Sequence, residues 1–440
     1  MKSKYLPIIF KTMQSSLNTN SGNGKLIEKP YLLPFVLVTS LFLLWGIPNN
    51  LNDILIRQFM KSFELTRFQA GLVQSAFYAG YFLLAYPSAL FMRKYSYKSG
   101  LIAGLLLFAI GCFLFYPAAL SNNYSYFLSA LFVIAAGLTF LETGANSFIA
   151  TLGDNANSER RLTFAQAFNP IGSIIGVLIG TAFIFSGIEL SAEVISLWKQ
   201  SNKYQQYLQD ETMRVVVPFL ILSGFSVIMA FVLLLTKFPV AKVTKVESQK
   251  QVGNIKTLFN NKNYVQGVIA QFFYVGAQVG TWSYFIQYVQ DNTGSDEKTA
   301  GLFLTGTLVA FAIGRFSATY VMKFIKPAIL MKWFSLVNSI LVLFSILFPG
   351  IAGMWALFST SFFMSLMYPT IFAMSVKGLG ENTKIGSSFL VMAIIGGAVC
   401  PPLMGLIAEI FNNMTIGFII PLVGYLYLIY YSSKNIIEKK

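Results

Sequence analysis

Long, uninterrupted blocks of apolar residues constrain this 440-residue chain more than any other feature of its sequence. Each block is about 20 residues long, enough for an α-helix to cross the roughly 30 Å hydrocarbon core of a bilayer. Only 11% of the residues are charged, whereas soluble domains carry about 25%. The sequence therefore predicts an all-α membrane protein and argues against a soluble enzyme or a nucleic-acid-binding module.

Twelve such blocks occur, and a lysine-rich stretch at 237–262 divides them into six and six. Two parallel six-helix repeats are typical of one large class of transporters. The predicted membrane helices are 31–56, 69–92, 100–120, 124–152, 162–188, 215–235, 265–289, 300–322, 328–348, 354–376, 387–411 and 415–431. The predicted domains are a disordered cytoplasmic tail (1–29), a first six-helix bundle (30–237), a cytoplasmic linker (238–262) and a second six-helix bundle ending in a short cytoplasmic tail (263–440).

Lysine and arginine are distributed unevenly among the gaps between the blocks. The gaps on one side hold 24 of them, including both terminal segments and the linker, and the gaps on the other side hold 7. Because basic loops stay in the cytoplasm, both termini and the linker are predicted to be cytoplasmic in a multi-pass inner-membrane protein. The net charge of +15 needs no partner beyond anionic membrane lipids.

Three of the 17 acidic residues fall within the apolar blocks: Asp53, Glu142 and Glu409. A carboxylate in the bilayer interior costs at least about 2.5–3.5 kcal/mol and requires an explanation. Glu409 lies close to a helix end, where an interfacial position explains it. Asp53 comes late in its block, so an interfacial helix end followed by Arg57 is the alternative to a functional role.

Glu142 lies deeper in its block than Asp53. Burial disfavours the charged form of a carboxylate, so such a glutamate can gain or lose a proton as its surroundings change, which a coupling residue must do. The alternative is a neutral or arginine-paired glutamate that serves packing only. Since the chain has no histidine, proton chemistry is left to these carboxylates.

Neutral polar residues accompany the two carboxylates. Asn50 lies one helical turn before Asp53, and Asn146 one turn after Glu142. Gln166 lies in the fifth block. Amides that faced lipid would remain unsatisfied, so they predict a water-filled cavity between helices.

The seventh block carries Gln271, Tyr274, Gln278 and Trp282 at spacings of three, four and four, which predicts one amide-and-aromatic face along a helix. We predict that Tyr274, Gln278 and Trp282 bind substrate, together with Asn146 of the fourth block. Tyr368, which precedes a proline in the tenth block, is a further predicted binding residue.

Arg315 is the one basic residue placed firmly inside a block. It has three possible roles: to pair with a carboxylate across the two halves, to bind substrate, or to extend towards the cytoplasmic loop. The sequence leaves these open.

Amides, carboxylates and an indole suit a sugar, which presents fixed hydroxyls and an apolar ring face. The motifs HExxH, GxSxG and GxxxxGK[ST] are absent, so the protein is predicted not to be an enzyme, and no metal or other cofactor is expected.

Several motifs are similar to those of the L-fucose:proton symporter family of the major facilitator superfamily. They are NNLNDIL at 49–55, FQAGLVQSAFY at 68–78, LET at 141–143, AQAFN at 165–169, QFFYVGAQ at 271–278, GRF at 314–316 and YPTIF at 368–372. The resemblance extends over about residues 30–419. It implies a sugar symporter that works by alternating access and binds its sugar at mid-membrane between two bundles.

The resemblance also implies roles for individual residues. It assigns proton coupling to Asp53 and Glu142, and sugar contacts to Asn50 and Gln166. The leading hypothesis is proton-coupled import of L-fucose or a related hexose by a monomer. The alternatives are a sodium-coupled glucose/galactose or amino-sugar symporter, in which the same carboxylates bind the ion, and a membrane receptor that binds sugar without moving it.

Overall fold

The computed structural model of the chain describes residues 27, 29–152, 161, 164–201, 203–238, 255–322, 324–377, 379 and 382–437. Helices and the turns between them make up this described part, in which no strand occurs. The prediction of an all-α protein is therefore confirmed. The predicted tail at 1–29 and the first part of the predicted linker lie almost entirely outside the described residues. The last part of the linker contains a short helix, α12 (Ile255–Asn260).

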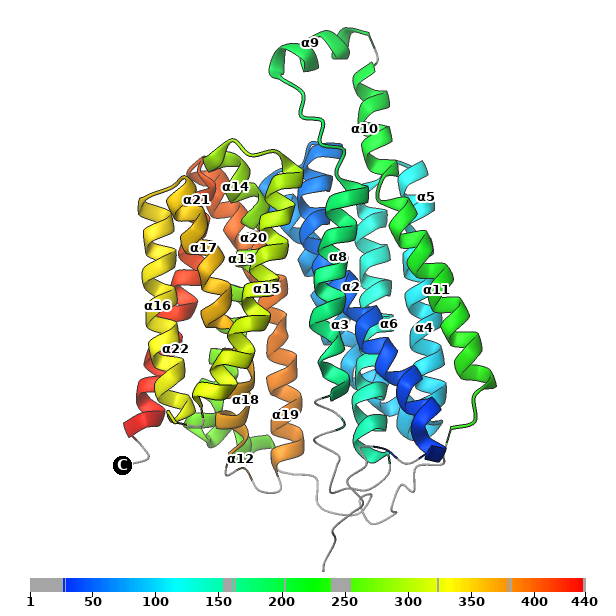
Figure 1. Ribbon diagram of the computed structural model, residues 1–440, viewed down its shortest axis with the longest axis vertical. Coiled ribbons are helices and arrows are strands. Elements are labelled where there is room, and N and C mark those ends of the chain that lie inside the picture. The colour runs from blue at the N-terminus through cyan, green and yellow to red at the C-terminus, as the bar shows by residue number, and fades with distance from the viewer. Residues whose placement is uncertain are drawn as a thin grey trace, which may run out of the picture.

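Two groups of helices lie side by side (Figure 1). The helices that precede the linker, here called the first bundle, are η1 (Lys29–Tyr31), α2 (Leu32–Ser62), α3 (Arg67–Lys94), α4 (Tyr97–Phe113), α5 (Phe115–Leu120), α6 (Tyr124–Thr151), α8 (Phe168–Ile179), η3 (Gly180–Ile184), α9 (Ala192–Gln200), α10 (Lys203–Met213) and α11 (Val216–Leu235). The helices that follow α12, here called the second bundle, are α13 (Lys262–Ser283), α14 (Phe285–Thr293), α15 (Glu297–Val321), α16 (Pro327–Leu347), α17 (Ile351–Met364), α18 (Met367–Val376), α19 (Thr383–Met392), η6 (Ala393–Ile395), α20 (Gly396–Ile410), α21 (Met414–Gly417) and α22 (Ile419–Ile437).

The two ends of the molecule are distinguished by short helices. Helices α9 and α10 extend from the end at the top of Figure 1, here called the α9 end, and α12 lies at the opposite end, here called the α12 end. Helix α2 runs towards the α9 end, and Asp53 lies in the half of this helix nearer that end.

Each of the twelve predicted spans overlaps one or more helices. Ten stretches within the described residues are long and apolar enough to cross a membrane. The predicted spans at 69–92 and 265–289 form α3 and α13–α14, which are not among these ten stretches. The prediction that the fifth span reaches residue 188 is wrong, because the helix ends at Ile184. Helices α9 and α10 fill the gap that follows and were not predicted.

Glycines bring α2 and α8 unusually close together. A Cβ atom on Gly172 would lie 2.2 Å from the backbone oxygen of Leu43, and one on Gly176 would lie 2.2 Å from that of Ile47. Gly46 on α2 is equally tight, since its Cβ would lie 2.3 Å from the backbone oxygen of Asn169. Small residues permit such close approach between membrane helices. This contact sets the distance between the polar faces of the two helices.

We expect Gly172→Leu to destabilise the protein by about 1–3 kcal/mol, because the larger side chain has no room against α2. Thermal unfolding of the purified protein in detergent measures this. Gly224→Leu is the matched control, since a Cβ on Gly224 of α11 meets nothing within 4 Å. Equal unfolding temperatures for the two variants would contradict the assignment of a tight α2–α8 contact.

Candidate ligand-binding cavity

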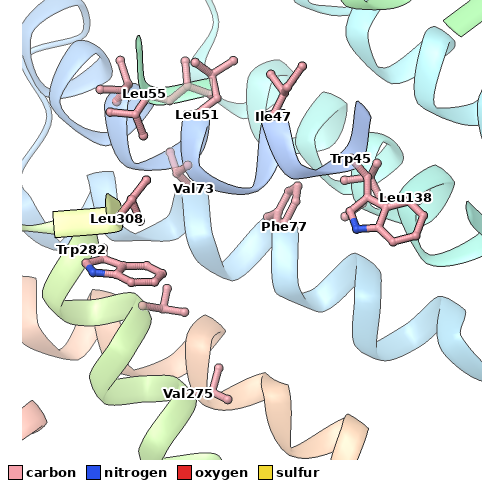
Figure 2. Close-up of a cluster of buried hydrophobic side chains, with 14 of the residues drawn as sticks. Trp45, Ile47, Leu51, Leu55, Val73, Phe77, Leu138, Val275, Trp282 and Leu308 are labelled. Carbon is pink, nitrogen blue, oxygen red and sulfur yellow. The ribbon is translucent and has the colours of Figure 1, made fainter. Parts of the chain in front are cut away.

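A cavity of about 800 Å³ lies between the two bundles. Its size falls within the 300–1,000 Å³ range of small-molecule sites. Its polar lining residues are Asn49, Asn50, Asp53, Gln74, Tyr78, Tyr81, Glu142, Asn146, Gln166, Asn169, Ser173, Gln278, Arg315 and Tyr368. Aromatic rings also line it, and Figure 2 shows two on opposing bundles: Phe77 on α3 and Trp282 on α13.

The structure brings the predicted site residues together, with one exception. Asp53, Glu142, Asn50, Asn146, Gln166, Gln278, Trp282 and Tyr368 all line the cavity. Tyr274, which we also predicted to bind substrate, does not line this cavity. It is fully buried, and its hydroxyl donates to the backbone oxygen of Met364 at 3.0 Å. Met364 ends α17, where backbone oxygens lose their helical partners, so Tyr274 completes a helix end instead of facing ligand.

Gln271, on the same predicted face, is also fully buried and lies outside the cavity lining. Of the four residues predicted to share one face of α13, only Gln278 and Trp282 line the cavity. Tyr274, in the other half of this face, contacts Met364 of α17 and Tyr368 of α18 in its own bundle. Which helices pack against a given helix face is decided by the tertiary structure, so the spacing of residues along the sequence does not reveal it.

Asp53 accepts three side-chain hydrogen bonds. Asn50 Nδ2 donates to Oδ2 at 3.2 Å, Gln74 Nε2 donates to Oδ1 at 2.9 Å, and Ser283 Oγ donates to Oδ1 at 3.1 Å. Only 3% of Asp53 is exposed. The alternative that Asp53 marks an interfacial helix end is therefore wrong. The sequence did not predict that Gln74 and Ser283 belong to the site. They lie 21 and 230 positions after Asp53, and no pattern in the sequence relates residues so far apart.

Glu142 faces the cavity from α6 and is half-buried. One turn further along the helix, Asn146 Oδ1 accepts from Gln166 Nε2 at 3.3 Å, which joins two of the predicted binding residues. Across the cavity, the guanidinium of Arg315 lies 4.8 Å from the ring centre of Phe311. Its place in the lining favours ligand binding or carboxylate pairing over extension towards the loop.

Charged side chains join the bundles at the α9 end. Lys61 on α2 pairs with Glu297 on α15 and with Glu211 on α10, each at 3.1 Å. Ser186 Oγ accepts from Lys61 at 2.9 Å, and the backbone N–H of Gly187 donates to Glu297 at 2.8 Å. No part of the Glu297 side chain is exposed. We call this group the Lys61 cluster.

A second group of contacts reinforces the closure. Arg67 at the start of α3 pairs with Asp291 on α14 at 3.0 Å, and the hydroxyl of Tyr284 donates to the backbone oxygen of Arg67 at 2.6 Å. The Phe68 N–H donates to Glu409 at 2.6 Å, so Glu409 lies at a helix end as predicted and also joins the bundles. The printed sequence contains no motif for these pairs. In the described residues, polar contacts thus close the cavity from the level of Asp53 to the α9 end.

Comparison with known proteins places the chain in a family. The sequence model of the Major Facilitator Superfamily matches residues 35–401. The L-fucose-proton symporter of Escherichia coli K12 is 41% identical over 90% of this chain and 91% of its own length. The L-fucose-proton symporter of Haemophilus influenzae is 36% identical over 93% and 98%. A putative glucose/galactose transporter of Helicobacter pylori J99 is 32% identical over 90% and 95%.

Solved structures agree with this assignment. The crystal structure of the transporter FucP in the outward conformation is 39% identical, covers 92% of this chain and 99% of its own, and has a TM-score of 0.67. An inward-facing bacterial homologue of the lysosomal transporter Spinster shares the fold, with a TM-score of 0.74 at 14% identity over 93% and 98%. The protein is a multi-pass inner-membrane protein, as its apolar blocks predicted. The chain belongs to the L-fucose-proton symporter family of the Major Facilitator Superfamily.

Proposed function

We propose that the protein imports L-fucose or a closely related hexose together with a proton. One observation carries this proposal: two acidic side chains, Asp53 and Glu142, face a cavity between the bundles whose other polar lining is mostly amide and hydroxyl. Its relatives in E. coli and H. influenzae are L-fucose-proton symporters, which favours this sugar over the glucose and galactose of the relatives at 31–32% identity.

The lining suits a neutral ligand rich in hydroxyls. Amides both donate and accept hydrogen bonds, so Asn50, Asn146, Gln166 and Gln278 can satisfy hydroxyls in either role. The Trp282 indole supplies a flat apolar surface for the ring face of a sugar. Tyr368 lies beside them, and Tyr274 acts indirectly, through its ring contact with Tyr368 at 6.3 Å between ring centres.

We propose the following topology. Twelve helices cross the inner membrane, six in each of two bundles that span 30–237 and 263–440, and the tail at 1–29, the linker at 238–262 and the C-terminus lie in the cytoplasm. The α9 end is then external, and the closure at that end makes the structure inward-facing. The whole cavity is built within one chain, which supports a monomer surrounded by anionic lipids at its basic cytoplasmic face.

In the proposed cycle, sugar and proton enter while the α9 end is open. Closure of the Lys61 cluster and its neighbours at that end then exposes the cavity to the cytoplasm. Sugar and proton leave, and the bundles rock back. Asp53 and Glu142 carry the proton, since no other acidic side chain among the described residues lines the cavity. This is alternating access of two bundles around one central site.

Uptake of radiolabelled sugars into proteoliposomes under imposed pH or sodium gradients tests the proposal. We expect L-fucose to accumulate under an inward proton gradient, whether or not sodium is present. Accumulation that requires sodium at fixed pH supports the sodium-coupled alternative instead. Binding to the purified protein without any flux supports a receptor.

We expect Glu142→Gln to abolish accumulation under a proton gradient while exchange of labelled for unlabelled sugar continues. The amide keeps the shape of the side chain but can no longer take up a proton. Glu193→Gln, at an exposed position on α9, is the control. Full accumulation by Glu142→Gln would remove this residue from the mechanism.

Gln166→Ala is expected to weaken L-fucose binding about tenfold, the effect of losing roughly one hydrogen bond to the ligand. Trp45 and Trp282 both line the cavity, so quenching of tryptophan fluorescence in the purified protein gives the Kd. Gln206→Ala changes an exposed amide on α10 and should leave the Kd unchanged. The same Kd in both variants would reject Gln166 as a binding residue.

Glu297→Gln should open the α9 end more often, because it removes one charge from the buried Lys61 cluster. A cysteine at the lining position Leu308 reports this opening, since a membrane-impermeant maleimide reaches it from outside only when that end is open. The two native cysteines, Cys112 and Cys400, are buried. We expect labelling in right-side-out vesicles to be several-fold faster.

The control for this experiment is Glu64→Gln. It breaks the exposed Lys199–Glu64 pair, which lies at the same end but within the first bundle. Equal labelling rates in the Glu64→Gln and Glu297→Gln backgrounds would contradict a gating role for the Lys61 cluster.

A further inference from the structure

Gln74 and Ser283 form a triangle of hydrogen bonds with Asp53. Gln74 Nε2 donates to Asp53 Oδ1 and to Ser283 Oγ, both at 2.9 Å, and Ser283 Oγ donates to Asp53 Oδ1 at 3.1 Å. Gln74 is 1% exposed and Ser283 is 3% exposed. The three side chains come from α3, α13 and α2. The triangle therefore joins one carboxylate to both bundles.

The triangle complements an ionised carboxylate. An ionised aspartate only accepts hydrogen bonds, and every polar side chain bonded to Asp53, including Asn50 on its other oxygen, acts as a donor. Hydrogen bonds donated to the charged form favour that form. In the state closed at the α9 end, these hydrogen bonds thus stabilise the ionised form of Asp53.

Gln74 can form a hydrogen bond with Asp53 whether the carboxyl group is ionised or protonated. Its Oε1 is buried and has no hydrogen-bond partner among the described residues. Rotation of the amide by 180° would turn this acceptor towards the O–H of a protonated Asp53, at the place where the N–H₂ now donates. Gln74 belongs to the same bundle as Asp53, so it remains beside the carboxylate when the bundles separate.

Ser283 differs from Gln74 in this respect. It is the last residue of α13, in the second bundle, and its bonds to Asp53 and Gln74 cross between the bundles. Opening of the α9 end moves α13 away from α2 and α3 and removes one donor from Asp53. The number of hydrogen bonds donated to Asp53 therefore differs between the state closed at the α9 end and the state open at that end.

The other ionisable groups near Asp53 do not change in this way. Tyr78 on α3 and Glu142 on α6 line the same cavity from the first bundle and move with Asp53. Glu211 on α10 is held by Lys61 in the same bundle, and Lys61 also pairs with Glu297 of the second bundle; the hydrogen bonds of Asp53 do not include these three side chains. On α2 itself, Arg57 pairs with Glu189 at 3.6 Å.

The second bundle contributes two ionisable groups to the cavity. Arg315 on α15 is bonded to the backbone oxygen of Ser365 in its own bundle at 3.3 Å, and Tyr368 lies on α18. The second-bundle side chain that donates to Asp53 is Ser283.

We propose that Ser283 and Gln74 are positioning residues that make proton release from Asp53 depend on closure of the α9 end. This rests on the proposed function, proton symport. Ser283 supplies the signal from the second bundle, and Gln74 holds the carboxylate in either charge state. Release is then favoured only while the cavity opens to the cytoplasm, so a proton carried inwards is not returned outside.

The test is the dependence of L-fucose uptake on internal and external pH, measured separately in proteoliposomes with inserted protein of one orientation. In Ser283→Ala, Asp53 loses a donor in the inward-facing state only. We expect the internal pH that gives half-maximal uptake to become about one unit more alkaline. The dependence on external pH should stay as in the parent protein, because Ser283 is apart from Asp53 when the α9 end is open.

Three further variants complete the design. Ser283→Thr keeps the hydroxyl and should restore the parent profile. Gln74→Met removes donor and acceptor together and should shift both the internal and the external profile, because Gln74 stays beside Asp53 throughout. Ser75→Ala is the matched control: its hydroxyl donates to the backbone oxygen of Ala398 at 2.6 Å and so also crosses between the bundles, without touching Asp53.

An unchanged internal profile in Ser283→Ala, or the same shift in Ser75→Ala, would overturn the inference. Equal shifts on both sides of the membrane in Ser283→Ala would do so too, since they indicate a merely structural role. The parent protein is measured in the same experiment. If it fails to accumulate L-fucose under a proton gradient, the proposed function fails independently of these variants.

Discussion

A carboxylate inside a membrane protein needs polar surroundings, because lipid cannot solvate its charge. At Asp53 this requirement is met by donors from three helices: Asn50 on α2, Gln74 on α3 and Ser283 on α13. The arrangement of the bundles depends on it, since one of these donors belongs to the opposite half of the molecule.

The two bundles meet through polar contacts in addition to close packing, since a Cβ on Gly71 of α3 would lie 2.8 Å from the backbone of Pro402 on α20. Gly46 and Gly172 bring α2 against α8 so tightly that a single added carbon would clash. Between the bundles, the Lys61 cluster and the Asp53 triangle depend on hydrogen bonds and charge. Rigid packing suits the parts that move as units, and polar contacts suit an interface that must separate and reform, since water can satisfy the same groups after separation.

Local spacing predicted the residues whose partners lie one helical turn away. Asn50 and Asp53 are three residues apart on one helix, and Glu142 and Asn146 are four apart, so their shared faces follow from helical geometry. Tyr274 satisfies the same spacing rule with respect to Gln278, yet it is buried against Met364. Periodicity reveals which residues share a face but not what covers it.

The sequence by itself determined the helical membrane fold, the division into two halves and the two intramembrane carboxylates, because apolar length and the cost of burying charge act on each segment separately. Only the tertiary structure decided which end is closed and what Asp53 is bonded to. Gln74 and Ser283 are 209 residues apart, and Lys61 and Glu297 are 236 apart. Such contacts arise when two bundles pack against each other, and no rule of local spacing connects their members.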